Sequence, residues 1–84
     1  MRVAYNTAKR RALEALATEP GRAWLVPELA ARAGLLPRRR AYTYLLRLWR
    51  MKLVDRGRWG QQVVYRITPT GLRRLAWLRA RGVA

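Results

Sequence analysis

Arginine side chains recur along residues 38–50 at a spacing that gathers most of them on one side of a helix. The stretch contains Arg38, Arg39, Arg40, Arg47 and Arg50, with Tyr42 and Thr43 between them. A guanidinium group is a planar fork of N–H donors that pairs bidentately with phosphate oxygens or with the O6 and N7 atoms of guanine. The pattern therefore predicts a surface that binds a polyanion, and the alternative is a basic face that only meets solvent.

A second polar cluster lies at residues 56–61, between two short β-rich segments. It consists of Arg56, Arg58, Trp59 and Gln61. An arginine on a hairpin can enter a narrow minor groove or bind a phosphate, and Gln61 can hydrogen-bond to either. Trp59 has three interpretations: it packs back on the core, it lies on a sugar, or it joins a partner surface. The hydroxyl of Tyr42 is a further candidate donor to a phosphate.

The overall charge supports this interpretation and excludes several kinds of chemistry. The chain of 84 residues has 19 Lys and Arg against four Asp and Glu, a net charge of +15, while 51% of its residues are hydrophobic. Such a chain is expected to fold as one domain, residues 1–84, and to attract polyanions. It has no Cys and no His, so we expect no metal site, no cofactor and no enzymatic activity.

Proline and glycine divide the chain into segments with clear periodicity. Helices are predicted over 3–17, 27–33, 37–53 and 69–81, strands over 54–58 and 62–67, and a short extended segment over 24–26 that must pair with a later strand. Gly34 is expected to end the second helix. Thr68 and Pro69 have the composition of an N-cap and a first helical residue. The predicted fold is α+β and mostly α.

The third helix is predicted to be strongly amphipathic. At 100° per residue its apolar arc holds Ala41, Tyr44, Leu45, Leu48, Trp49 and Met51, and the opposite arc holds Arg39, Arg40, Thr43, Arg47 and Arg50. Tyr42 and Leu46 lie on the border. The apolar arc must cover a core, which leaves the guanidinium arc for a partner.

This order of elements resembles the winged helix-turn-helix superfamily, and in particular the MarR-like and PadR-like transcriptional regulators. Its helix-turn-helix corresponds to residues 27–53, with Glu28-Leu29-Ala30 at the opening and Gly34-Leu35 at the turn, and its wing to 54–67. Leu53-Val54 is similar to the entry to the wing, with Lys52 in place of the usual glycine, which strains that turn. The segment VYRITPTG, residues 64–71, is similar to the motif that closes the wing.

The resemblance implies a homodimer that places the third helix in the major groove of double-stranded DNA and the wing on the backbone or minor groove. We expect pairing through the first and last helices, with Tyr5, Leu75, Trp77 and Leu78 as an exposed apolar patch. The alternative is that these side chains only cover the core of a monomer. Leu75, Trp77 and Leu78, with Leu72 and Ala76, are also the predicted apolar side of the last helix.

Three functions compete for this sequence. The first is sequence-specific DNA binding in transcription regulation, in the cytoplasm and at the nucleoid. The second is nonspecific nucleic-acid binding, by a chromatin-like, replication-associated or RNA-binding protein, because phosphate contacts alone give affinity without specificity. The third is a module for protein–protein contact, which does not require a net charge of +15. We favour the first.

Overall fold

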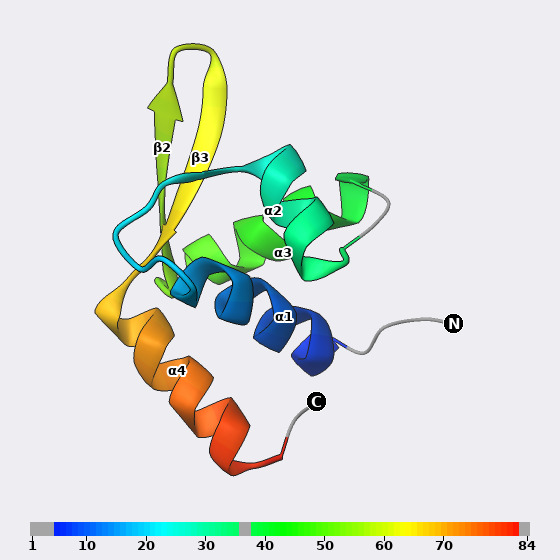
Figure 1. The fold of residues 1–84 in the computed structure, drawn as a ribbon, viewed down its shortest axis with the longest axis vertical. Coiled ribbons are helices and arrows are strands. Elements are labelled where there is room, and N and C mark those ends of the chain that lie inside the picture. Colours follow the sequence, from blue (N-terminus) through cyan, green and yellow to red (C-terminus); the bar gives the residue numbers. More distant parts are fainter. Residues whose placement is uncertain (1–4, 36–37, 83–84) are drawn as a thin grey trace.

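The structure, a computed structural model, describes the backbone of residues 5–35 and 38–82 and the side chains of residues 7–35 and 39–82. Within these ranges the chain forms a group of helices with a small antiparallel sheet beside them, which confirms the predicted α+β, mostly helical fold (Figure 1). The elements are α1 (Tyr5–Ala17), β1 (Trp24–Leu25), α2 (Val26–Ala33), α3 (Arg38–Arg50), β2 (Val54–Trp59), β3 (Gln62–Ile67) and α4 (Pro69–Ala80). The β2–β3 hairpin projects at one end of the molecule and α4 lies at the other (Figure 1).

The core lies where α1, α2 and α3 meet, and β1, β3 and α4 close it. Leu13, Leu29 and Leu45 are each 0% exposed. Burying a leucine side chain contributes about 1.5–3 kcal/mol relative to leaving it in water. Repetition of such residues at helical spacing fixes which side of each helix points inward.

The sheet has the strand order β1-β3-β2, and all its pairings are antiparallel. Trp24 of β1 lies opposite Tyr65 of β3, so the short extended segment pairs with a later strand as predicted. Trp59 and Gln62 are partners at the hairpin tip. Gly60 has φ 63° at the first central position of the two-residue connection, which is the conformation of a type II′ turn.

The structure corrects two helix boundaries. Val26, predicted as extended, is the first residue of α2. The third helix ends at Arg50 rather than at residue 53, and Lys52 adopts a left-handed conformation with φ 62°. The Lys52 N–H donates to the Trp49 carbonyl at 2.9 Å and the Leu53 N–H donates to the Leu48 carbonyl at 3.0 Å. This pair of bonds is a Schellman motif, in which glycine normally occupies the place of Lys52.

A close contact joins the base of the hairpin to α4. The Thr68 side chain caps α4 by accepting from the Gly71 N–H at 3.0 Å, and its hydroxyl lies 2.9 Å from the Leu53 carbonyl oxygen. A Cβ atom added to Gly71 would lie 2.1 Å from the same Leu53 oxygen. The glycine in the 64–71 motif is therefore required because backbone meets backbone at this junction.

The last helix has a different orientation from the predicted one. Leu75 and Leu78 are 1% and 0% exposed, so they belong to the core of the monomer, and their predicted place in an exposed apolar patch is wrong. Leu72 and Ala76, predicted to face inward, are exposed. The reason is that α4 packs mainly on α1 along its Leu75–Leu78 edge.

Replacing Lys52 by glycine is expected to stabilise the domain. A non-glycine residue in the left-handed region costs about 1–2 kcal/mol. Glycine removes this strain, but part of the gain is lost because glycine gives the unfolded chain more conformational entropy. We expect a gain of about 0.5–1 kcal/mol in urea unfolding. Lys52→Ala removes the same charge but keeps a Cβ, so it should give no such gain. An equal gain for both variants would show that the stabilisation comes from the lost charge and not from relief of backbone strain at residue 52.

Gly71→Ala is expected to destabilise the domain by about 1–3 kcal/mol or more, because the added methyl group meets a backbone carbonyl that cannot move freely. Gly21→Ala is the matched control, since nothing lies within 4 Å of the Cβ position at Gly21. Thermal unfolding followed by circular dichroism measures both. Similar midpoints for the two variants would show that the contact between Gly71 and Leu53 relaxes at little cost.

Candidate nucleic-acid interface

The basic side of α3 faces outward, as the periodicity predicted. Ala41, Leu45 and Leu48 are each 0% exposed and fix the inner side of the helix. The exposed side chains of the opposite side and its flanks are Arg39, Arg40, Tyr42, Thr43, Arg47 and Arg50. The Arg38 side chain lies outside the described residues. Tyr44 is half-buried and packs against the core, which agrees with its predicted place.

The apolar arc of α3 is narrower than predicted. Trp49 and Met51 are 42% and 38% exposed, so their prediction as core residues is wrong. The Arg56 guanidinium lies over the Trp49 ring, with Cζ 5.5 Å from the ring centroid. This contact joins β2 to the flank of α3. Helical periodicity does not predict this contact, because Trp49 lies only about 40° around the helix from the buried Leu45 and is therefore expected to be buried as well.

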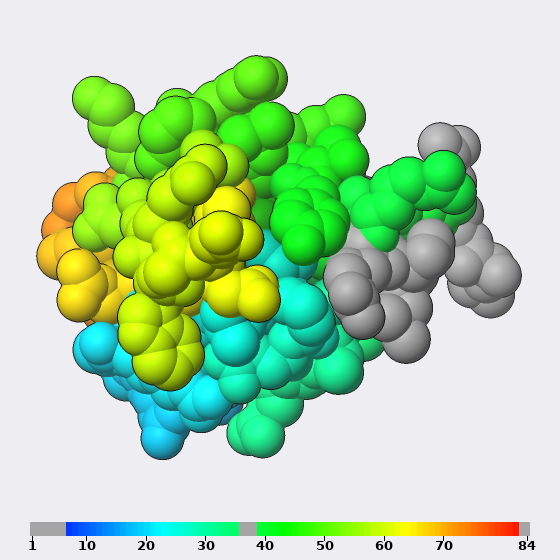
Figure 2. All heavy atoms as spheres, turned by 90° about the horizontal axis from the view of Figure 1, so that it is seen from above, coloured from blue at the N-terminus to red at the C-terminus, as the bar shows by residue number. Residues whose placement is uncertain are grey.

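The hairpin presents its polar residues to solvent beside α3. Arg56, Arg58 and Gln61 are exposed, and Trp59 is 72% exposed. Packing of Trp59 back on the core is therefore the wrong interpretation of the three. Seen from the hairpin end, the hairpin (yellow) and α3 (green) lie next to each other on one face (Figure 2). The two sequence clusters thus form one surface.

Three of the four acidic residues form ion pairs away from this surface. Glu14 of α1 accepts from Arg79 of α4 at 2.8 and 2.5 Å and from Arg10 at 3.4 Å. The hydrogen bond from Arg79, more than the one from Arg10, holds the pKa of Glu14 below its ordinary value. Glu14 therefore links α1 to α4 and neutralises charge there.

The second group of ion pairs lies before α2. Arg22 donates to Glu19 at 2.8 Å and to Glu28 at 2.7 Å, and the Leu25 N–H donates to Glu28 at 2.9 Å. Residues 38–62 then hold eight basic residues against one acid, Asp55. The surface formed by α3 and the hairpin consequently keeps a strong positive charge.

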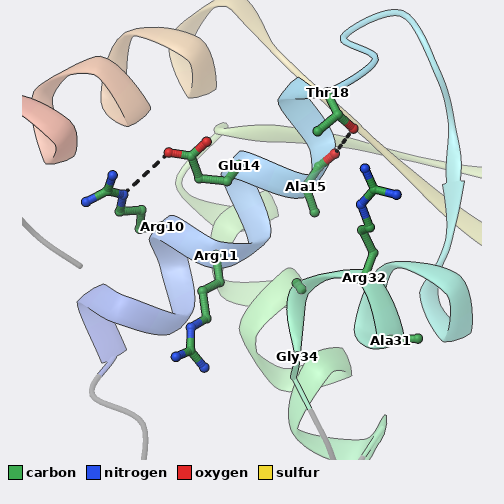
Figure 3. A pocket seen from close by; sticks show the side chains of 9 residues that line it. Arg10, Arg11, Glu14, Ala15, Thr18, Ala31, Arg32 and Gly34 are labelled. Carbon is green, nitrogen blue, oxygen red and sulfur yellow. Dashed lines mark hydrogen bonds and ion pairs between the residues drawn. The ribbon is translucent and has the colours of Figure 1, made fainter.

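A groove that the sequence did not predict lies between α1 and the C-terminal end of α2 (Figure 3). It has a volume of about 850 Å³, and Arg10, Arg11, Glu14, Thr18, Arg32 and Gly34 are among its lining residues.

Across residues 5–35 and 38–82, no group of three or more His, Cys, Asp or Glu side chains lies close enough together to hold a metal ion. The helices in these same ranges are too short or too polar to cross a membrane.

The comparisons with known proteins agree with this architecture. The sequence matches no family model, and no curated protein matches it significantly. Among solved structures it is similar to a MarR family transcription regulator, with TM-score 0.75 and 24% identity over 89% of this chain and 50% of that one. It is also similar to the PcaV transcriptional regulator from Streptomyces coelicolor in complex with its natural ligand, with TM-score 0.70 and 33% identity over 87% of this chain and 54% of that one.

A third similar structure is that of a protein from Archaeoglobus fulgidus, with TM-score 0.65 and 19% identity over 83% of this chain and 81% of that one. The chain thus has a winged-helix fold of the MarR type, and the β2–β3 hairpin is its wing. It spans about half the length of the two regulators. Both of these proteins are transcription regulators.

Proposed function

We propose that the protein is a sequence-specific double-stranded DNA-binding protein that regulates transcription in the cytoplasm, at the nucleoid. The observation that carries the proposal is the arginine-rich side of α3, exposed next to the wing on one face. An α-helix with its side chains is about 10–12 Å across, and the major groove of B-DNA is about 12 Å wide. Insertion of α3 brings Arg39, Thr43 and Arg50 to the base edges and phosphates of that groove.

The residues divide into two roles in this proposal. Arg39, Arg40 and Thr43 lie in the N-terminal half of α3, the part of a recognition helix that contacts bases. Arg47 and Arg50 lie further along and suit phosphates. In the wing, Arg56 and Arg58 contact the backbone or the minor groove, and Gln61 supplies a hydrogen bond at the tip. Exposed Trp59 is suited to contact a sugar there.

Two-fold pairing of the protein stays a prediction. Of the four residues expected at the interface, Leu75 and Leu78 are excluded by their burial, the Tyr5 side chain lies outside the described residues, and Trp77 is 47% exposed. Two copies related by a two-fold axis would present two α3 helices to successive turns of the duplex. The bound site would then be an inverted repeat.

Selection of bound duplexes from a random pool tests the proposed function. At about 150 mM salt, a sequence-specific protein should enrich one short site, because base contacts add about 4–10 kcal/mol over nonspecific binding. Sequencing of the selected pool gives the result. Enrichment of no sequence, with tight and salt-sensitive binding to every duplex, would favour the nonspecific alternative. No binding at all would favour the protein–protein module.

Arg39→Ala is expected to weaken binding to the selected site by about 1–3 kcal/mol and to relax the preference at one base pair, because a bidentate arginine–guanine contact is lost. Competition binding with single-base variants of the site measures both effects. Arg11→Ala, which removes an arginine of α1 that is also exposed, is the matched control and should leave the preference unchanged. Uniform weakening on all sequences would instead make Arg39 a phosphate contact.

Arg58→Ala is expected to lower the slope of log K against log salt concentration by about one unit, since each neutralised phosphate contributes about 0.9. Binding isotherms between about 50 and 200 mM salt give the slope. The Arg11→Ala variant again serves as the control of equal charge. A slope identical to that of the unmodified protein would remove the wing tip from the interface.

A further inference from the structure

More than half of the basic residues lie outside the segment that forms the proposed DNA contact. Residues 38–62 hold eight of the 19, and the other eleven are distributed over α1, α2, β3, α4 and the segments next to them. Arg10, Arg22 and Arg79 form ion pairs with acidic residues. A single interface on α3 and the wing therefore leaves much of the positive charge of the chain away from the duplex.

Part of this charge is concentrated on the outer side of α4. Arg73, Arg74, Trp77 and the C-cap residue Arg81 are here called the α4 patch. Arg73 and Trp77 lie on the side of the helix opposite Leu75 and Leu78, and Arg74 lies on the flank toward α1. Arg73, Trp77 and Arg81 are exposed and Arg74 is half-buried. In the described part of the chain, no ion pair involves a residue of this patch. Its guanidinium groups therefore remain available to an external anion.

The indole of Trp77 organises these groups. The Cζ atoms of Arg81 and Arg74 lie 4.5 and 5.5 Å from the centroid of its ring. Arg73 donates to the Thr70 hydroxyl at 3.0 Å, and Thr70, Arg73, Arg74 and Trp77 line a shallow depression of about 460 Å³. Because two guanidinium groups already lie near the Trp77 ring, they would compete with an unpaired base for stacking on it. The patch suits phosphates of a duplex better than a single strand.

Positive charge extends behind the patch. Lys9 of α1 is 5% exposed, and its pKa is lowered by burial and then by the nearby charge of Arg74. Neighbouring cations raise the local electrostatic potential, and a bound polyanion lowers it. Pairing with a second copy about a two-fold axis would instead oppose the patch to itself and bring like charges together.

We propose that the α4 patch is a second binding site for the phosphate backbone of duplex DNA, so that one domain holds two duplex segments. The bridging rests on the proposed function, because the first duplex occupies α3 and the wing. The arrangement permits it: the wing and α4 lie at opposite ends of the 38 Å long axis (Figure 1). Seen from the wing side, α4 appears only at one edge (Figure 2).

A two-duplex capture experiment tests the site. A duplex is fixed on beads and loaded with protein, the excess is washed away, and a fluorescent duplex of unrelated sequence is added. The unmodified protein should retain the second duplex. Arg73→Gln with Arg81→Gln should load the first duplex within about twofold of the unmodified protein but capture about tenfold less of the second, because two phosphate contacts are lost.

Three further measurements make the outcome decisive. Arg11→Gln with Arg32→Gln removes the same charge at the α1–α2 groove and should capture like the unmodified protein. Arg39→Gln with Arg40→Gln should load less protein than the unmodified chain on a duplex that carries the selected site, because only the wing and the α4 patch still bind it. Normal loading of that variant would count against the proposed function rather than against the α4 patch. Circular dichroism melting shows that each variant is folded.

Several results would overturn the second site. One is capture by the α4 variant equal to that of the unmodified protein. Another is an equal loss in the α1–α2 control, which would reduce the effect to net charge. A third comes from sedimentation equilibrium: a dimer of the unmodified protein that becomes a monomer in the α4 variant would make the patch an interface between copies.

Discussion

Burial of the apolar side of α3 sets the orientation of this helix in the domain. Its inner residues Ala41, Leu45 and Leu48 are completely buried, and the free energy of that burial fixes the rotation of the helix about its own axis. Because a helix has two sides, the same burial turns Arg39 and Arg50 outward. The stability of the core and the geometry of the proposed DNA contact are therefore set by one interaction.

The wing is held at a defined place beside α3 by the junction at its base. The left-handed Lys52 ends α3 and turns the chain into β2, and the Leu53 carbonyl then meets both Thr68 and Gly71 at the start of α4. Higher up, Arg56 lies over Trp49. These contacts link α3, β2 and α4 through both backbone and side-chain atoms, so the wing and α3 form one surface rather than two independent ones.

Charge is distributed over the molecule in a way that fits contact with nucleic acid on more than one side. The acids Glu14, Glu19 and Glu28 serve structural ion pairs that join α1 to α4 and order the start of α2. Few acids are left to neutralise α3, the wing or the α4 patch. The proposed sequence-specific binding and the proposed holding of two duplexes are compatible, because the first would depend on base contacts of α3 and the second on phosphate contacts of the α4 patch.

The order of the elements, the outward side of α3 and the cap at Thr68 could be predicted from the sequence, because periodicity and proline act locally. The same holds for the end of α2 at Gly34, which has φ 68°, and for strain at Lys52. Packing of the elements was needed to establish that Trp49 lies beneath Arg56, that Trp59 is exposed, and that Leu75 and Leu78 are buried while Leu72 is not. The burial of each of these side chains depends on which neighbouring element covers it. The periodicity of the sequence predicts that α4 is a helix, but it does not fix the rotation of α4 about its own axis relative to α1.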